Sequence, residues 1–186
     1  MRVVSGTARG RKLRAPAGRG TRPITDRAKE AIFNMLASLG GVEGLVVADL
    51  WAGSGSFGIE CLSRGAERVT FVERGREALA CLRGNLEALG FQDRATVVPA
   101  SVESALPGLG PVDLAFCDPP YADDPWAELL GRLQADLVVG HAERPIELPP
   151  GWEELRRRTY GKARIVIARR GGPRPRPNRH SDPPGE

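Results

Sequence analysis

The chain has 186 residues and a mass of 20.0 kDa, a length that suits one domain with at most a short extension. Hydrophobic residues make up 41% of the sequence, which is enough for one core and excludes a chain that is disordered throughout. The longest stretch without a charged residue is twelve residues (31–42), whereas a membrane-spanning helix needs about 18 apolar residues or more. The sequence therefore predicts no membrane span. Three widely spaced cysteines and an N-terminus without the apolar segment of a secretion signal make the cytoplasm the expected compartment.

Charge is distributed unevenly along the chain. Residues 1–25 carry seven Lys and Arg and no acidic residue, residues 26–155 carry 10 basic and 21 acidic residues, and residues 156–186 carry 10 basic and 2 acidic residues. An acidic body with two basic ends is typical of a protein that meets a polyanion. The alternative is that the basic ends serve only as solubilising tails.

In chain order, the predicted elements begin with an Arg-rich β-hairpin arm over residues 1–22, which is broken by glycines. A helix is expected to begin near Thr25 and to stop at Gly40. Short apolar runs then predict strands at 45–50, 68–73, 95–98, 112–117 and 137–139. Two more strands, at 154–158 and 163–168, are expected to close the domain. Amphipathic helices are expected after the first, second and fourth of these strands.

This alternation predicts an α/β fold with a doubly wound, mostly parallel, seven-stranded sheet and an antiparallel hairpin at one edge. We expect a basic N-terminal arm at 1–24 and the main domain at 25–169. Residues 170–186 contain five Pro, three Gly and no apolar side chain, so this tail is expected to be disordered.

A glycine-rich segment predicts a site for a nucleoside cofactor. Gly53-Ser54-Gly55-Ser56-Phe57-Gly58 follows a predicted strand and opens a predicted helix, and Glu73 lies at the end of the next strand. Free N–H groups at the start of the helix can bind an anionic group. A carboxylate at Glu73 can accept hydrogen bonds from both hydroxyls of a ribose.

The position of Asp49 favours S-adenosylmethionine over a dinucleotide. Asp49 lies inside the first strand, where its charge would repel a pyrophosphate but attract an ammonium or sulfonium group. Too little chain follows Glu73 to build a separate substrate domain for hydride transfer. Ser101 and Val102, after the third strand, are expected to border the adenine ring. The alternatives are an NAD-dependent oxidoreductase and a strand–turn–helix without a ligand.

The segment Asp118-Pro119-Pro120-Tyr121 predicts a catalytic loop, because it leaves the carboxyl end of the fourth strand, where open α/β sheets bind ligands. An exocyclic amine on a nucleobase is a poor nucleophile. A carboxylate and a rigidly held backbone carbonyl can accept both of its N–H bonds, which orients the nitrogen and stabilises positive charge growing on it. Tyr121 offers a face for stacking, and no His or Cys cluster points to a metal. Alternatively, Asp-Pro-Pro is only a turn.

The loop resembles the D/N-P-P-Y/F motif of amino-group methyltransferases. Over about residues 1–169 the chain resembles the RsmD family, the 16S ribosomal RNA (guanine(966)-N(2))-methyltransferases. Besides that loop, the segments that carry the resemblance are Gly10-Arg11-Lys12-Leu13, Arg22-Pro23-Ile24-Thr25-Asp26-Arg27, Phe33-Asn34, Asp49-Leu50-Trp51-Ala52-Gly53-Ser54-Gly55, Leu62-Ser63-Arg64-Gly65-Ala66 and Phe71-Val72-Glu73. Trp51 stands where the family usually has a smaller aromatic residue, and Ile24 where it often has Thr.

The resemblance implies a Rossmann-like class I S-adenosylmethionine-dependent methyltransferase that modifies the N2 amine of a guanine in small-subunit ribosomal RNA. It implies that residues 118–121 hold the guanine and that the Gly53 loop and Glu73 hold the cofactor. Thr25 and Arg27 would line the cofactor or base pocket. The partner would be ribosomal RNA, in the small ribosomal subunit or an assembly intermediate of it, and the protein is expected to be a monomer.

Basic side chains of the arm are expected to contact RNA phosphates, which position a nucleic acid without specifying its sequence. They are Arg9, Arg11, Lys12, Arg14, Arg19 and Arg22. The target guanine should be unpaired or extruded. Two alternatives stay open: a DNA adenine-N6 methyltransferase, which would use the same loop but has no room here for a target-recognition domain, and a non-catalytic RNA-binding or assembly factor.

Overall fold

The structure, a computed structural model, describes residues 1–16, 24–120 and 124–172. Its elements are α1 (Asp26–Ala37), β1 (Val46–Leu50), α2 (Ser56–Ser63), β2 (Arg68–Glu73), α3 (Arg76–Leu89), η1 (Gln92–Arg94), β3 (Ala95–Pro99), α4 (Val102–Ala105), η2 (Leu106–Gly108), β4 (Val112–Cys117), α5 (Trp126–Arg132), β5 (Ala135–Ala142), β6 (Trp152–Tyr160) and β7 (Ala163–Arg170). Within these ranges, no helix has the length and apolar character needed to cross a membrane.

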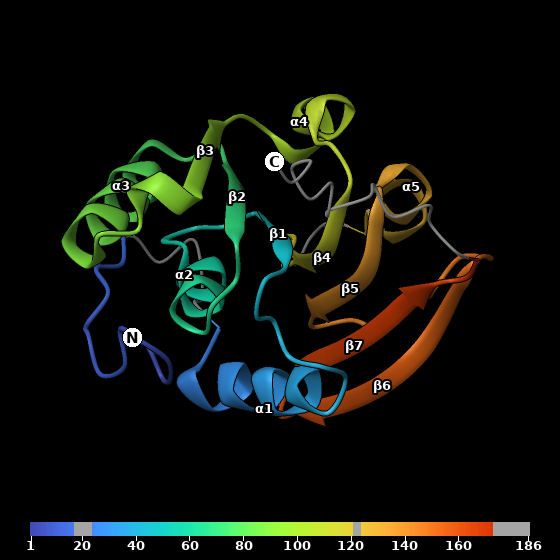
Figure 1. Cartoon of the computed structure of the whole chain (residues 1–186). Helices are drawn as coiled ribbons and strands as arrows, with labels where there is room; N and C mark the ends of the chain where they lie inside the picture. The colour runs from blue at the N-terminus through green and yellow to red at the C-terminus, as the bar shows by residue number, and fades with distance from the viewer. Residues whose placement is uncertain (17–23, 121–123, 173–186) are drawn as a thin grey trace, which may run out of the picture.

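The seven strands form one sheet in the order β3-β2-β1-β4-β5-β7-β6 (Figure 1). β1 to β5 are parallel, whereas β7 runs antiparallel to β5 and β6 runs antiparallel to β7. The predicted sheet with an antiparallel edge hairpin is therefore confirmed. The winding reverses between β1 and β4, and open α/β sheets bind ligands at the carboxyl ends of the strands that flank such a reversal.

Helices cover both faces of the sheet. One apolar core packs α1, α2 and α3 against one face, and the second core packs α4 and α5 against the other. The central strands β1, β4 and β5 are covered on both faces, which explains why their predicted segments are continuous apolar runs rather than alternating ones. This layering leaves the carboxyl ends of the strands as the accessible edge of the sheet.

Two strands are longer than the sequence predicts. β5 runs from Ala135 to Ala142 rather than over 137–139, because Gly140 and His141 continue the pairing with β7 although neither is apolar. β6 starts at Trp152 and ends at Tyr160, and its register shifts near its middle. As an edge strand with exposed side chains, it needs no apolar run, so an apolar pattern underestimates its length.

The N-terminal arm folds back on itself and packs against the domain. Arg2 and Lys12 form an antiparallel bridge, and turns occupy most of the residues between them. The predicted hairpin is thus present as a single bridge rather than as two strands. Val3 and Leu13 are buried in the same core as α1 and α2, so the first part of the arm belongs to the folded body.

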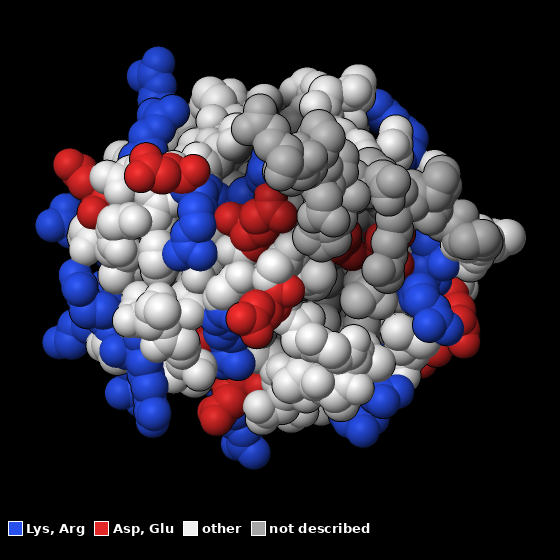
Figure 2. All heavy atoms as spheres, in the orientation of Figure 1, with Lys and Arg blue, Asp and Glu red and all other residues white. Residues whose placement is uncertain are grey.

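Exposed basic side chains gather on the arm and on α3, and Figure 2 shows them at the left of this face. We call this surface the basic face; its residues are Arg9, Arg11, Lys12, Arg14, Arg76 and Arg83. The Arg11 guanidinium donates to the carbonyl of Ala88 at 2.7 Å, and the backbone of Arg14 is hydrogen-bonded to Asn85. The arm and α3 therefore present one continuous surface.

Candidate active site

A cavity of about 390 Å³ opens at the carboxyl ends of the strands where the winding reverses, a size typical of small-ligand sites. The predicted site residues that line it are Asp49, Gly53, Ser54, Glu73, Ser101, Val102, Asp118, Pro119 and Pro120. The glycine-rich loop and the Asp118 loop, which are far apart in the sequence, therefore face the same space.

Two predicted site residues on α1 do not line this cavity. Thr25 is exposed and is the N-cap of α1, where its hydroxyl accepts a hydrogen bond from the amide of Ala28 at 3.1 Å. Arg27 is also exposed, whereas the neighbouring Ile24 does line the cavity. Tyr121 lies outside the described residues.

Gly55 does not line the cavity either, and its glycine identity has a packing cause. Its φ is 81°, in the left-handed region, and a Cβ there would lie 2.3 Å from Cδ1 of Leu82. Because Gly55 is the N-cap of α2 and has no side chain, the first amides of that helix need other acceptors.

Asp49 supplies one of those acceptors from β1. Its Oδ2 accepts a hydrogen bond from the amide of Gly58 at 2.9 Å, and its side chain is buried. Burial raises the pKa of the Asp49 carboxyl well above its ordinary value of 3.8; the hydrogen bond from Gly58 opposes this, and the charges of Asp118 and Glu73 add to it. Asp49, Glu73 and Asp118 thus place three carboxyl groups around one cavity, and a cationic ligand there would favour their ionised forms.

Glu73 braces the glycine-rich loop. Its Oε2 accepts from the amide of Gly53 at 2.8 Å, and its Oε1 accepts from the amides of Arg74 and Gly75 at 2.9 and 2.7 Å. An ionised carboxylate has about four acceptor positions, so Glu73 retains capacity for a hydroxyl donor from a ligand.

The floor of the cavity is aromatic. The rings of Phe33 and Phe57 stack with their centroids 4.9 Å apart, and those of Phe57 and Phe116 stack at 4.0 Å. Phe57 and Phe116 also line the cavity. Because the three rings come from α1, α2 and β4, they fix the glycine-rich loop and the start of the Asp118 loop on one rigid base.

Trp51 turns the chain from β1 into the glycine-rich loop. Among the non-glycine residues in the described ranges, only Trp51 has a positive φ, at 57°. A left-handed conformation at a bulky residue stores about 1–3 kcal/mol of strain, and such residues occur mostly at functional sites. Trp51 lines the cavity, so the strained turn places an aromatic ring in its wall.

Sequence reasoning missed a histidine beside the Asp118 loop. Nδ1 of His141, on β5, lies 2.8 Å from Oδ1 of Asp118, and the His141 side chain is buried. The apolar run that predicts this strand ends at Val139, and His141 lies two residues beyond it. Knowing that β5 runs parallel to β4 and extends further would have placed His141 next to Asp118.

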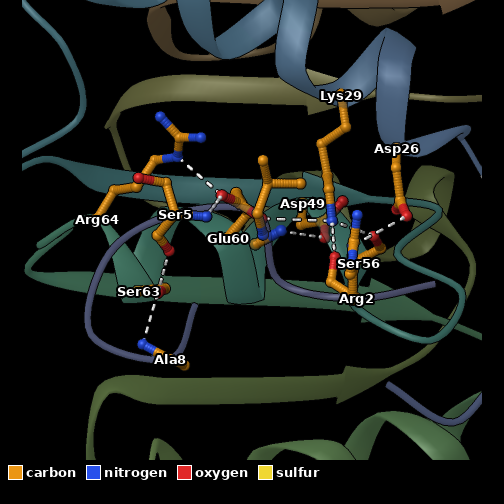
Figure 3. A network of polar contacts seen from close by, with 12 residues as sticks. Arg2, Ser5, Ala8, Asp26, Lys29, Asp49, Ser56, Glu60, Ser63 and Arg64 are labelled. Carbon is orange, nitrogen blue, oxygen red and sulfur yellow. Dashed lines mark hydrogen bonds and ion pairs between the residues drawn. The ribbon is translucent and has the colours of Figure 1, made fainter. Parts of the chain in front are cut away.

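A buried ion pair, also missed, joins the arm, α1 and α2 (Figure 3). Nζ of Lys29 lies 3.3 Å from Oε2 of Glu60, and both side chains are fully buried. Lys29 also donates to the carbonyl of Arg2 at 2.7 Å and to the hydroxyl of Ser56, a cavity residue, at 3.2 Å. Burial lowers the pKa of Lys29, although the carboxylate of Glu60 acts in the opposite direction.

Glu60 on α2 and Asn85 on α3 attach the arm to the domain by hydrogen bonds to its backbone. Glu60 accepts from the amides of Val4 and Ser5 at 2.8 and 2.9 Å and from Nε of Arg64 at 2.9 Å. The amide group of Asn85 exchanges two hydrogen bonds with the backbone of Arg14 and donates a third to the carbonyl of Ser54, a cavity residue. The arm is thereby attached to the glycine-rich loop. Lys29 and Asn85 each lie on the apolar face of a predicted helix, three residues from an apolar position. A polar side chain at such a position indicates a buried hydrogen bond or ion pair, and this signal could have found both residues.

The predicted RNA-binding residues divide into two groups. Arg9, Arg11, Lys12 and Arg14 are exposed on the basic face. Arg19 and Arg22 lie outside the described residues, as does most of the predicted tail. In the described part of the chain, no group of three or more His, Cys, Asp or Glu could hold a metal ion.

Comparison with known proteins identifies the family. Residues 1–169 match the family described as conserved hypothetical protein 95. The Bacillus subtilis protein named "Putative rRNA methyltransferase YlbH" is 38% identical, with 92% of this chain and 100% of that protein covered. Ribosomal RNA small subunit methyltransferase D of Escherichia coli K12 is 33% identical, with 91% and 90% covered. The chain belongs to the RsmD family.

A solved structure agrees with the RsmD assignment. "Putative methyltransferase yhhF from Escherichia coli" superposes with a TM-score of 0.80 at 32% identity, covering 92% of this chain and 98% of the other. The predicted methyltransferase fold class is therefore confirmed, and with it the resemblance to the RsmD family.

Proposed function

We propose that this RsmD-family protein transfers a methyl group from S-adenosylmethionine to the exocyclic N2 amine of a guanine in small-subunit ribosomal RNA. The observation that carries the proposal is the shared cavity, in which Asp118 faces the loop braced by Glu73. Relatives named as ribosomal RNA methyltransferases support the reaction and the class of substrate.

The residues of the cavity fit this cofactor. Glu73 retains acceptor capacity for a ribose hydroxyl, and the buried carboxylate of Asp49 suits the cationic groups of the methionine part. Ser101 and Val102 line the same cavity, and we assign them to the edge of the adenine ring. When bound, S-adenosylmethionine supplies an activated methyl group on its sulfonium.

The Asp118 loop would hold the guanine. A carboxylate oxygen of Asp118 accepts one hydrogen of the N2 amine, and a backbone carbonyl in the Pro119-Pro120 segment accepts the other. This aims the nitrogen lone pair at the methyl carbon and stabilises positive charge that develops on the nitrogen. The methyl group is already activated, so positioning supplies most of the catalysis. We assign the stacking of the base to Tyr121.

RNA would bind across the basic face, with the arm at 1–24 positioning the phosphates and the domain at 25–169 carrying the chemistry. We assign Thr25 and Arg27 to the rim where RNA passes from the arm to the cavity. The basic tail at 170–186 would add attraction that depends on salt. We further propose that the protein acts as a monomer in the cytoplasm, on the small ribosomal subunit or an assembly intermediate of it.

The test is transfer of labelled methyl groups from S-adenosylmethionine to ribosomal RNA and to small-subunit particles. Asp118→Ala should lower the rate by about 100-fold or more, because it removes the acceptor for the amine. Asp93→Ala is the matched control, since Asp93 is exposed on η1 and should leave the rate unchanged. Calorimetry should show that both variants still bind S-adenosylmethionine.

Three outcomes would contradict the proposal. Comparable methylation of duplex DNA would favour an adenine-N6 methyltransferase. Binding of NAD without binding of S-adenosylmethionine would favour an oxidoreductase. RNA binding with no methyl transfer to any ribosomal substrate would favour a non-catalytic assembly factor.

A further inference from the structure

The carboxylate of Asp118 has a buried partner. Its Oδ1 lies 2.8 Å from Nδ1 of His141, and the side chains of Asp118 and His141 are 22% and 6% exposed. An ionised carboxylate can only accept hydrogen bonds, so Nδ1 of His141 must carry the hydrogen. We propose that His141 is a positioning residue that fixes the Asp118 carboxylate for the amine of the base, an inference that rests on the proposed function.

The sheet explains why these residues meet. Cys117, the last residue of β4, is paired with Gly140 of β5, so the chain enters the Asp118 loop just as β5 reaches His141. β5 continues as an inner strand, because β7 pairs with it on the other side and places Ile165 opposite His141. His141 is thus anchored in the sheet, whereas Asp118 begins a loop.

The contact leaves one carboxylate oxygen for the substrate. A carboxylate at the start of a loop can rotate about its side-chain bonds, and each rotation misplaces the acceptor. With Oδ1 of Asp118 held by His141, Oδ2 is the oxygen left to accept from the base. The N–H donor also opposes the repulsion from Asp49 and Glu73, which line the same cavity. His141 therefore acts through Asp118 and needs no contact with the base.

A positioning role differs from a proton relay in what may replace the imidazole. The side-chain amide nitrogen of asparagine lies about where Nδ1 of histidine lies, so His141→Asn retains the donor but cannot carry a proton onward. His141→Leu removes the donor and places an apolar side chain at the same buried position of β5. The pair of variants isolates the hydrogen bond from the other properties of the imidazole.

Steady-state methylation of ribosomal RNA with these variants is the activity test. His141→Leu should lower kcat by about 100-fold, the effect expected when a reacting group is misplaced by about 1 Å. The KM for RNA and the Kd for S-adenosylmethionine should change less than threefold, because His141 touches neither ligand and the phosphate contacts that dominate RNA affinity are kept. His141→Asn should restore kcat to within about threefold of the wild type. Wild-type kcat in His141→Leu, or an Asn variant as slow as the Leu variant, would overturn the proposal.

A spectroscopic measurement tests the contact even if a variant folds poorly. The chain contains two histidines, and the second, His180, lies outside the described residues. In a His180→Gln protein labelled with ¹⁵N-histidine, the His141 resonances should show a hydrogen on Nδ1, and Asp118→Ala should abolish that preference. A hydrogen on Nε2 alone in the parent would overturn the proposal. If the wild type methylates no ribosomal RNA, the proposed function fails, and the ¹⁵N spectrum still decides whether His141 holds Asp118.

Discussion

At the scale of single residues, Asp49 combines a structural role with the cofactor-binding role proposed for it. Its carboxylate caps the start of α2, whose N-cap is a glycine with no side chain to do so. It is buried beside two other carboxylates, which raises its pKa. Without ligand, a neutral side chain at this buried position would make the folded protein more stable. A negative charge there would instead favour the binding of a cationic ligand. The binding role proposed for Asp49 therefore carries a cost in stability.

Asp49→Asn tests this trade-off through pH. The unfolded chain loses the Asp49 proton near 3.8, whereas the folded protein retains it to a higher pH. Between those two values the folded state binds more protons, so the contribution of Asp49 to stability falls as pH rises. Asparagine does not ionise, so without ligand the variant should have a higher Tm than the wild type at pH 8. Each kcal/mol gained in the free energy of unfolding should raise the Tm by about 2–4 °C. The difference should shrink towards pH 4.

The same variant should bind S-adenosylmethionine about 10-fold more weakly, because a charge interaction of about 1.4 kcal/mol is lost. Calorimetry and thermal unfolding measure the two effects, with the exposed Asp93→Asn as control. A Tm that drops equally at every pH, or an unchanged Kd, would refute the assigned role of Asp49.

At the scale of elements, one buried acidic residue joins the arm to both α1 and α2. Glu60 of α2 accepts from the amides of Val4 and Ser5 and pairs with Lys29 of α1 and Arg64. Lys29 is fully buried, so no water can replace this acceptor for its ammonium group. The arm, α1 and α2 therefore share a single electrostatic anchor beneath the cavity.

Glu60→Leu should lower the free energy of unfolding by about 3–5 kcal/mol, because it leaves Lys29 as a buried charge without its partner. Trypsin should then cut the arm at Arg9 or Arg11. Glu128→Leu is the control, since the Glu128–Arg132 pair on α5 is exposed and such pairs contribute about 0–1 kcal/mol. Denaturant unfolding measures both variants. Equal losses in the two would show that Glu60 anchors nothing.

At the scale of the whole molecule, the parts that followed an apolar pattern were predictable. The parallel strands of the sheet and the two loops that face the cavity followed from apolar runs and from the glycine, Asp and Pro residues that end them. Contacts between polar residues far apart in sequence were not predictable. His141 needs the register of β5 against β4, and Glu60 needs the arm to be packed on α2. The apolar pattern of a segment indicates whether that segment is a helix or a strand. It does not indicate which residues of two segments lie opposite each other.

The basic face should make RNA binding depend on salt. Each phosphate contact contributes about 0.7–0.9 to the slope of log K against log salt. The double variant Arg9→Ala/Lys12→Ala should therefore lower the magnitude of that slope by about 1.5. Arg169→Ala is the control, because Arg169 lies on β7 and pairs with Glu153 at 2.7 Å. A slope unchanged in the arm variant, or lowered equally in the control, would place the RNA elsewhere.

We propose that one cavity brings a guanine amine to an activated methyl group. Nucleoside mass spectrometry of ribosomal RNA, isolated from cells with and without this protein and from cells with the Asp118→Ala variant, tests it most directly. We predict one N2-methylguanosine in the small-subunit RNA that is present only with the unaltered protein. An identical set of methylated nucleosides in all three, or a dependent methyl group on adenine N6 instead, would contradict the claim.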